Sequence, residues 1–280
     1  RTPIARPTET PTATPSVTPT RTPSLTPTPQ GKPTHRPGIT VEIPGLPSDA
    51  IPLEMVLIPA GTFLMGSQPD ERGRSSDEAQ HQVTISQDFY IGKYEITQAQ
   101  WRAVMKSNPS TNVTGGSHPV ESVSWNDCQT FIQTLNQMRP ESAEKFRLPT
   151  EAEWEYACRE RTTTRFYWGD DLNETEIGKH AWYTGNSPSI TQRVGRKIPN
   201  AWGLYDMNGN VWEWCHDLYG SYPSGPAVDL MCEQPGDTKY VIRGGSCSCP
   251  ARLCRSACRL KTGFVGPDVG FRVVLSSWTP

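Results

Sequence analysis

Short apolar runs interrupted by polar loops are the main pattern of this chain. Ile51 to Met65 (IPLEMVLIPAGTFLM) predicts two short strands around Pro59–Gly61. Further strand-like segments carry apolar residues in the same way: Val83 with Ile85, Phe89 with Ile91, Tyr240 to Ile242, and Val269 to Val274. The β-branched and aromatic residues of the last segment favour a buried closing strand.

Three helix starts are marked by a Ser or Thr whose side chain can pair with the residue three positions later. These pairs are Thr97 with Gln100, Ser124 with Asp127, and Thr150 with Glu153. After Ser124, an apolar stripe at helical spacing predicts a helix packed on a core. The stripe consists of Cys128, Phe131, Ile132, Leu135 and Met138. Few helices among many short strands predict an α+β domain with little regular secondary structure.

The N-terminal segment has a different composition. Prolines recur every fourth position from residue 3 to 27, and the first aromatic residue is Phe63. Such a sequence cannot bury enough apolar surface to order itself. We therefore predict a disordered Pro/Thr-rich linker or stalk over residues 1–47 and a folded domain over residues 48–280. A stalk favours a place outside the cytoplasm or on the cell surface, with an anchor or signalling domain expected upstream.

Charge and length narrow the class of protein. The chain carries a net charge of −2, and residues 1–36 contribute five Lys/Arg and one Glu, a net of +4, so the remaining residues carry −6. This balance argues against a nucleic-acid partner. No apolar run has the length of a membrane-spanning helix, so no direct membrane insertion is expected.

An oxygen-rich turn lies in the segment 200–214 (NAWGLYDMNGNVWEW). Asp206, Asn208, Asn210 and Glu213 surround Gly209. Calcium prefers six to eight such oxygen ligands. The chemistry leaves two alternatives open, a cation site and a hydrogen-bonded turn.

Four cysteines cluster near the C-terminus, after the pair Gly244–Gly245, at positions 247, 249, 254 and 258. Arginines stand among them at positions 243, 252, 255 and 259. Neighbouring cations would lower the pKa of these thiols. Disulfides Cys247–Cys258 or Cys249–Cys254 are alternatives, whereas a zinc site would have unusual spacing. Cys128 and the pair Cys215–His216 are expected to be packed in the core.

Seven ordered motifs resemble the formylglycine-generating enzyme (sulfatase-modifying factor) family. They are LIPAGTFLMGS, FYIGKYEITQAQW, PVESVSW, RLPTEAEWEYAC, NAWGLYDMNGNVWEW, IRGGS and VGFRVV. The resemblance implies a modified C-type-lectin fold. It also implies a structural Ca²⁺ held by the side chains of Asp206 and Glu213 and the carbonyls of Gly209 and Val211.

The family contains oxidases, which convert a cysteine of a sulfatase to formylglycine with O₂ and Cu(I). Their two copper-binding cysteines follow the serine of the GGS motif by three and eight residues. In this chain Ser246 is followed at those distances by Cys249 and Cys254. The resemblance to the oxidases therefore implies catalytic roles for Ser246, Cys249 and Cys254, and copper binding by the two cysteines. However, Pro250 replaces the histidine after the first cysteine, and Leu253 replaces an aromatic residue.

Other relatives are ligand-binding modules, including the variable proteins of diversity-generating retroelements. They present mixed side chains on a fixed frame. The corresponding positions here are Cys247, Ser248, Cys249, Leu253, Cys258, Leu260 and Lys261. We favour a display module that binds a protein or peptide ligand through the segment 247–268, and the copper oxidase is the alternative.

Overall fold

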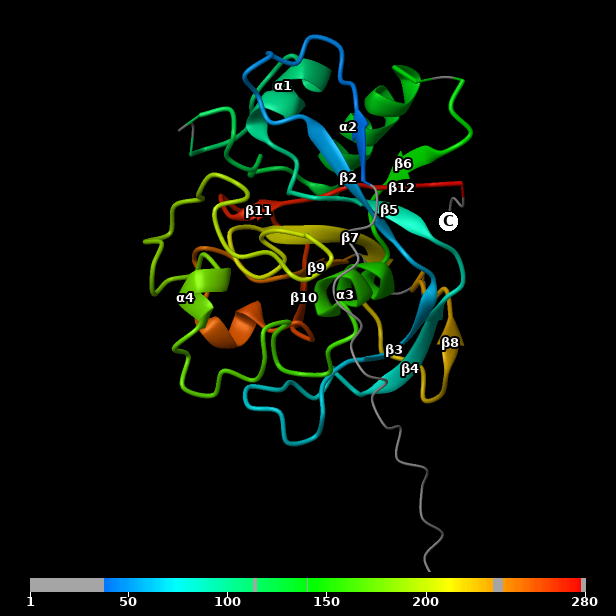
Figure 1. The fold of residues 1–280 in the computed structure, drawn as a ribbon, viewed down its shortest axis with the longest axis vertical. Helices are drawn as coiled ribbons and strands as arrows, with labels where there is room; N and C mark the ends of the chain where they lie inside the picture. Colours follow the sequence, from blue (N-terminus) through cyan, green and yellow to red (C-terminus); the bar gives the residue numbers. More distant parts are fainter. Residues whose placement is uncertain (1–37, 113–114, 140, 234–238, 278–280) are drawn as a thin grey trace, which may run out of the picture. The chain divides into compact units, whose positions relative to one another are not determined.

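The computed structural model describes residues 38–112, 115–139, 141–233 and 239–277 (Figure 1). The predicted linker lies outside the described residues up to position 37. Within residues 38–47, Ile39–Val41 forms strand β1, which pairs with the strand around Met55. The folded domain therefore begins upstream of residue 48.

The largest sheet has five strands in the order β1-β2-β5-β12-β6. Its other members are β2 (Leu53–Ile58), β5 (Phe89–Gly92), β12 (Val274–Ser276) and β6 (Lys145–Arg147). All pairs are antiparallel, and Val274 stands opposite both Ile91 and Arg147. The C-terminal strand therefore lies inside the sheet, between segments from much earlier in the chain.

A second sheet has four strands in the order β10-β9-β7-β11. They are β10 (Arg259–Thr262), β9 (Tyr240–Arg243), β7 (Trp212–Leu218) and β11 (Val269–Gly270). The single closing strand predicted over residues 269–274 is wrong in this respect. The chain leaves the second sheet after Gly270 and enters the first at Val274. A side chain at Gly270 would collide with the carbonyl of Val120, so this position requires glycine.

The third sheet is small and has the order β3-β4-β8. It contains β3 (Gly61–Met65), β4 (His81–Ile85) and β8 (Ala227–Val228), and β8 runs parallel to β4. The strand pair predicted in residues 51–65 is confirmed as β2 and β3.

All three predicted helix starts are confirmed with complete capping boxes. They begin α1 (Gln98–Met105), α2 (Trp125–Gln137) and α3 (Glu151–Arg159). The predicted stripe on α2 is buried from Cys128 to Leu135, and Met138 is the C-cap residue. Two single turns complete the helices, α4 (Ile177–His180) and the 3-10 turn η1 (Ala251–Cys254).

Helix α3 occupies the centre of the described domain. In Figure 1, α1 and α2 lie together on one side of the five-stranded sheet, whereas α3 contacts β3, β4, β7 and β9. Every residue of α3 is buried, including Trp154 and four charged side chains: Glu151, Glu153, Glu155 and Arg159. A helix with buried carboxylates needs cationic partners from other segments, and these partners build the candidate site.

Among the described residues, no helix has the length and apolar content needed to cross a bilayer.

Candidate functional site

A tight turn carries the chain from β9 into the cysteine-rich segment. Gly244 and Gly245 have φ values of +94° and +76°, a region that favours glycine. A Cβ at Gly245 would lie 2.8 Å from the Sγ atom of Cys254 and equally close to the carbonyl oxygen of Leu253. The turn therefore packs directly against the cysteine-rich segment, and only glycine fits.

Three of the four arginines in and beside this segment are buried anchors. Arg259 forms two hydrogen bonds with Glu151 of α3, Nε to Oε1 and Nη2 to Oε2, both 2.7 Å. Arg243 pairs with Glu155 of the same helix and also donates to the carbonyl of Ala257 at 2.8 Å.

A third anchor reaches the polar loop after β3. Arg255 Nη2 lies 2.6 Å from Glu78 Oε1, and its Nη1 lies 2.6 Å from Glu71 Oε1. Both sides of the cysteine-rich segment are thus tied to other elements by buried ion pairs, which makes it a rigid part of the domain.

The four clustered thiols are buried, and none forms a disulfide in this structure. Burial raises the pKa of Cys247 and of Cys258 to about 12, and it also raises the pKa values of Cys249 and Cys254. The expectation of lowered thiol pKa values is therefore wrong in its net result. Arg255 and Arg243 do lower the pKa of Cys258, but the loss of hydration on burial disfavours the thiolate more strongly.

Ser246 joins the first predicted copper-binding cysteine to an acidic residue. Its Oγ atom lies 3.2 Å from Cys249 Sγ and donates to Asp268 Oδ2 at 2.6 Å. The charge of Cys249 is among the influences that raise the pKa of Cys254. Ser246 thus contacts the first of the two cysteines, and the copper-binding and catalytic roles stay a prediction. Copper would require thiolates, which this buried setting disfavours.

The predicted display positions differ in their exposure to solvent. Cys247, Cys249 and Cys258 are buried and do not belong to the exposed surface that a display module requires. Ser248 and Leu253 are half-buried. Leu260 is 40% exposed and Lys261 is also exposed, but both lie on edge strand β10 rather than in a loop.

Two exposed apolar residues within the predicted segment 247–268 were not singled out from the sequence. Phe264 is 81% exposed, and its neighbour Val265 is also exposed, directly after β10. In the sequence, the two consecutive apolar residues between Gly263 and Gly266 could have indicated this exposed apolar site. We define the display surface as Ser248, Leu253, Leu260, Lys261, Phe264 and Val265.

The oxygen-rich turn is connected to the cysteine-rich segment. Asn208 Nδ2 donates to the carbonyl of Cys254 at 2.6 Å, and the backbone N–H of Cys247 donates to the carbonyl of Asn210 at 2.8 Å. The hydrogen-bonded turn considered from the sequence is therefore present. It fixes the position of both ends of the segment 247–254.

The side chains expected to bind calcium fit it in part. Asp206 Oδ2 accepts the N–H of Gly195 at 2.7 Å, whereas the buried Oδ1 has no hydrogen-bond partner. Burial raises the pKa of Asp206 to about 6. Both oxygens of Glu213 are already bonded to Arg272, and Oε2 also accepts the N–H of the Trp154 indole at 2.8 Å.

A third carboxylate near this turn was missed in the sequence. Glu95 is buried, accepts hydrogen bonds from Asn210 and Val211, and has its pKa raised by burial and by the charges of Asp206 and Glu213. The positive charges that act on Asp206 within this group come from Arg272 and Lys197. Among the described residues, no three His, Cys, Asp or Glu side chains already converge as a metal site.

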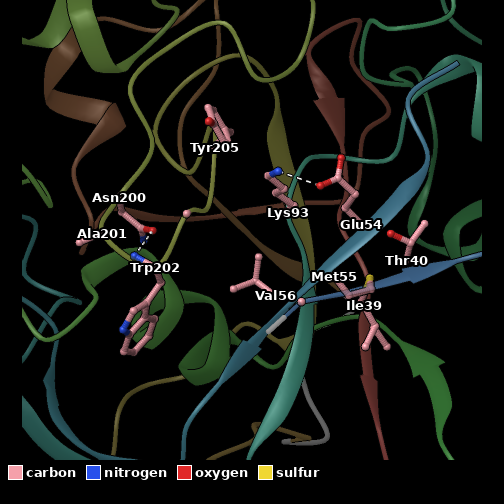
Figure 2. A pocket seen from close by; sticks show the side chains of 12 residues that line it. Ile39, Thr40, Glu54, Met55, Val56, Lys93, Asn200, Ala201, Trp202 and Tyr205 are labelled. Atoms are coloured by element: carbon pink, nitrogen blue, oxygen red, sulfur yellow. Dashed lines mark hydrogen bonds and ion pairs between the residues drawn. The ribbon is translucent and has the colours of Figure 1, made fainter. Parts of the chain in front are cut away.

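A separate cavity of about 480 Å³ lies between β1, β2 and the segment around Trp202 (Figure 2). Lys93 Nζ forms a 2.7 Å ion pair with Glu54 and lies 5.8 Å from the centre of the Tyr205 ring. None of the predicted site residues lines this cavity.

The comparisons with known proteins agree with the motifs. Residues 47–277 match the family model of the sulfatase-modifying factor enzyme 1-like domain. The chain is 31% identical to the chaperone protein LppX of Paenibacillus barcinonensis over 80% of this chain and 89% of that protein. It is 35% identical to the formylglycine-generating enzyme of Streptomyces coelicolor over 56% of this chain and 50% of that enzyme.

Among solved structures, Treponema denticola variable protein 1 superimposes with a TM-score of 0.74 and 29% identity, covering 85% of this chain and 98% of that one. The predicted α+β, modified C-type-lectin fold is thereby confirmed. With a family model that covers most of its length, the chain belongs to the sulfatase-modifying factor enzyme 1-like family.

Proposed function

We propose that this domain binds a protein or peptide ligand through the display surface. The observation that carries this proposal is the division within one segment: its cysteines, Arg255 and Arg259 are buried in the frame, whereas Ser248, Leu253, Leu260 and Lys261 reach the surface. Exposed residues on a rigid support tolerate change, because they do not contribute to the core. This is the arrangement that a binding module needs.

Two relatives support a macromolecular ligand. LppX is named as a chaperone protein, and the Treponema protein is named as a variable protein. Phe264 and Val265 add apolar area next to the charged Lys261. Apolar residues surrounded by polar ones are typical of protein-binding surfaces.

The second candidate is a copper-dependent oxidase that forms formylglycine. The contact between Ser246 and Cys249, and the neighbouring Cys254, favour it, as does the similarity to the Streptomyces enzyme. The raised pKa values of both thiols and Pro250 in place of the family's histidine weigh against it.

A random-peptide phage library panned against the full chain tests the binding proposal. Selected peptides should lose binding to Leu260→Ser and Lys261→Ser. They should keep it with Ile198→Ser and Lys179→Ser, which make the same changes at other exposed positions. Equal binding to all four variants, or no selected peptide, would contradict the proposal.

Incubation of the copper-loaded chain with O₂ and a Cys-x-Pro-x-Arg peptide tests the second candidate. Formylglycine detected by mass spectrometry, and lost in Cys249→Ser and Cys254→Ser, would establish the oxidase instead.

A further inference from the structure

Arg165 is a buried charge in the irregular segment that follows α3. It is 2% exposed, and its guanidinium lies 4.8 Å from the centre of the Phe166 ring. Removing a cation from water is costly unless an anion compensates it. The buried guanidinium of Arg165 therefore requires an anionic partner close to it.

The other buried arginines of the described chain each have a buried carboxylate partner. These pairs are Arg147–Glu153, Arg159–Glu155, Arg243–Glu155, Arg255–Glu78, Arg259–Glu151 and Arg272–Glu213. In five of these six pairs, the guanidinium nitrogen lies 2.6 to 2.7 Å from the carboxylate oxygen. Close contact between buried groups is the rule in this domain.

Arg165 departs from this rule. Its carboxylate partner is Glu174, which is 37% exposed and lies 3.3 Å away. Its Nη1 is 3.4 Å from the carbonyl of Asp171, and its buried Nε has no hydrogen-bond partner. The guanidinium thus has capacity for a second, closer anion.

The place for that anion is a pocket of about 370 Å³ beside the cysteine-rich segment. It is lined by Arg72, Gly73, Arg165, Glu174, Pro250, Ala251 and Arg252. Three guanidinium groups against one carboxylate give it a net positive charge. Arg72 Nη1 donates to the carbonyl of Leu172 at 2.5 Å, and the described residues supply no ion-pair partner for Arg72 or Arg252.

The other acidic residues nearby line a neighbouring pocket. Asp70, Glu71 and Asp170 line a second pocket that shares Arg72 and Arg165. Glu71 is already paired with Arg255 at 2.6 Å. Asp170 Oδ1 accepts the backbone N–H of Arg165 at 3.1 Å and keeps its negative charge. None of these three carboxylates lines the pocket next to Pro250 and Arg252, whose own lining contains three arginines and Glu174.

We propose that this pocket binds an anionic side chain, carboxylate or phosphate, of the peptide ligand, with Arg165 as the buried contact and Arg72 and Arg252 at the rim. Planar guanidinium groups match the oxygen atoms of both anions. The inference rests on the proposed function and narrows its ligand class. Pro250 and Arg252 belong to the same segment as Ser248 and Leu253, so one acidic peptide can reach both surfaces.

Fluorescein-labelled hexaglutamate, hexaglutamine and hexaphosphoserine peptides, at one ionic strength, test this inference with the full chain. The acidic peptides should bind about tenfold or more tightly than hexaglutamine. Arg165→Gln and Arg252→Gln should remove this difference. Arg196→Gln, which removes an exposed arginine outside the pocket, should keep it. The tighter of the two acidic peptides identifies the anion.

Glu174→Gln adds an opposite expectation, because removal of the competing carboxylate should strengthen binding of the acidic peptides. If Arg165→Gln does not fold, Arg252→Gln and Glu174→Gln decide the matter, since both positions are exposed. Acidic peptides that bind Arg252→Gln as tightly as Arg196→Gln would overturn the inference. Library peptides that depend on Leu260 but not on acidic residues would leave the proposed display function standing alone.

Discussion

Arg272 and Glu213 form a buried, two-pronged ion pair, with 2.6 Å between Nε and Oε2 and 2.7 Å between Nη2 and Oε1. The pair connects the segment between β11 and β12 to strand β7. Its guanidinium also donates to the carbonyls of Gly92 and Tyr205. A residue expected to bind calcium thus has a structural role that does not need the ion.

This pair predicts that Glu213→Gln destabilises the domain with or without calcium. The change leaves the buried Arg272 without its counter-charge, which costs about 3–5 kcal/mol. Urea unfolding in EDTA should show this loss. The same substitution at Glu176, in an exposed pair with Lys179, should cost less than about 0.5 kcal/mol. Equal effects at the two positions would show that the burial of the pair has no energetic consequence.

Asp206 is the better test of calcium binding, because its buried Oδ1 has no partner in the protein. We expect calcium to raise the melting temperature of the wild type and to have little effect on Asp206→Asn. At a free concentration 100 times the dissociation constant, a bound ion stabilises by about 2.7 kcal/mol. A wild-type melting curve that does not change between EDTA and calcium would exclude the site.

The cysteines should differ in their rates of alkylation. Cys232 is half-buried, whereas the other seven thiols are buried. We expect N-ethylmaleimide to label Cys232 first in the native chain, because the four clustered thiols are inaccessible and have raised pKa values. Peptide mapping by mass spectrometry gives the order. Early labelling of Cys249 or Cys254 would instead favour the oxidase.

The glycine turn below the cysteines provides a graded stability test. Gly245→Ala adds both a strained φ and a contact with Cys254, whereas Gly203 has a φ of +83° with nothing within 4 Å of an added Cβ. Gly203→Ala should cost about 1–2 kcal/mol for the backbone conformation alone. Gly245→Ala should cost more, and Gly225→Ala, in open space, should cost least. Unfolding free energies that do not follow this order would contradict the assigned close packing.

The sequence predicted what local chemistry determines and failed where distant segments meet. The capping boxes of Thr97, Ser124 and Thr150 need only residues three positions apart, and all three are confirmed. Arg255, in contrast, pairs with Glu78, 177 residues away, and neither this pair nor the burial that outweighs the effect of Arg255 on Cys258 can be read from the local sequence. Likewise, β10 forms because Leu260 pairs with Ile242, and its own sequence contains no clear strand pattern.

Asp217 predicts how stability depends on pH. This carboxyl group is buried at the start of α3, where its oxygens accept the N–H groups of Cys232 at 2.8 Å and Glu151 at 2.7 Å. Burial and the nearby charge of Glu151 raise its pKa to about 7, compared with about 3.9 in an unfolded chain. Between these values the folded chain holds a proton that the unfolded chain has released. The protonated Asp217 carboxyl group therefore contributes its full stability below about pH 4, and this contribution is lost as the pH rises to about 7.

Urea unfolding at pH 5 and pH 8 measures this loss, which should be about 2–3 kcal/mol for this group. In Asp217→Asn the side chain has no charge at either pH. The variant gives up one backbone hydrogen bond, and that cost is the same at both pH values. Asp206 and Glu95 titrate in both proteins, so the difference between wild type and variant isolates Asp217. If the variant loses as much stability as the wild type between pH 5 and pH 8, Asp217 is already ionised in the folded chain at pH 5.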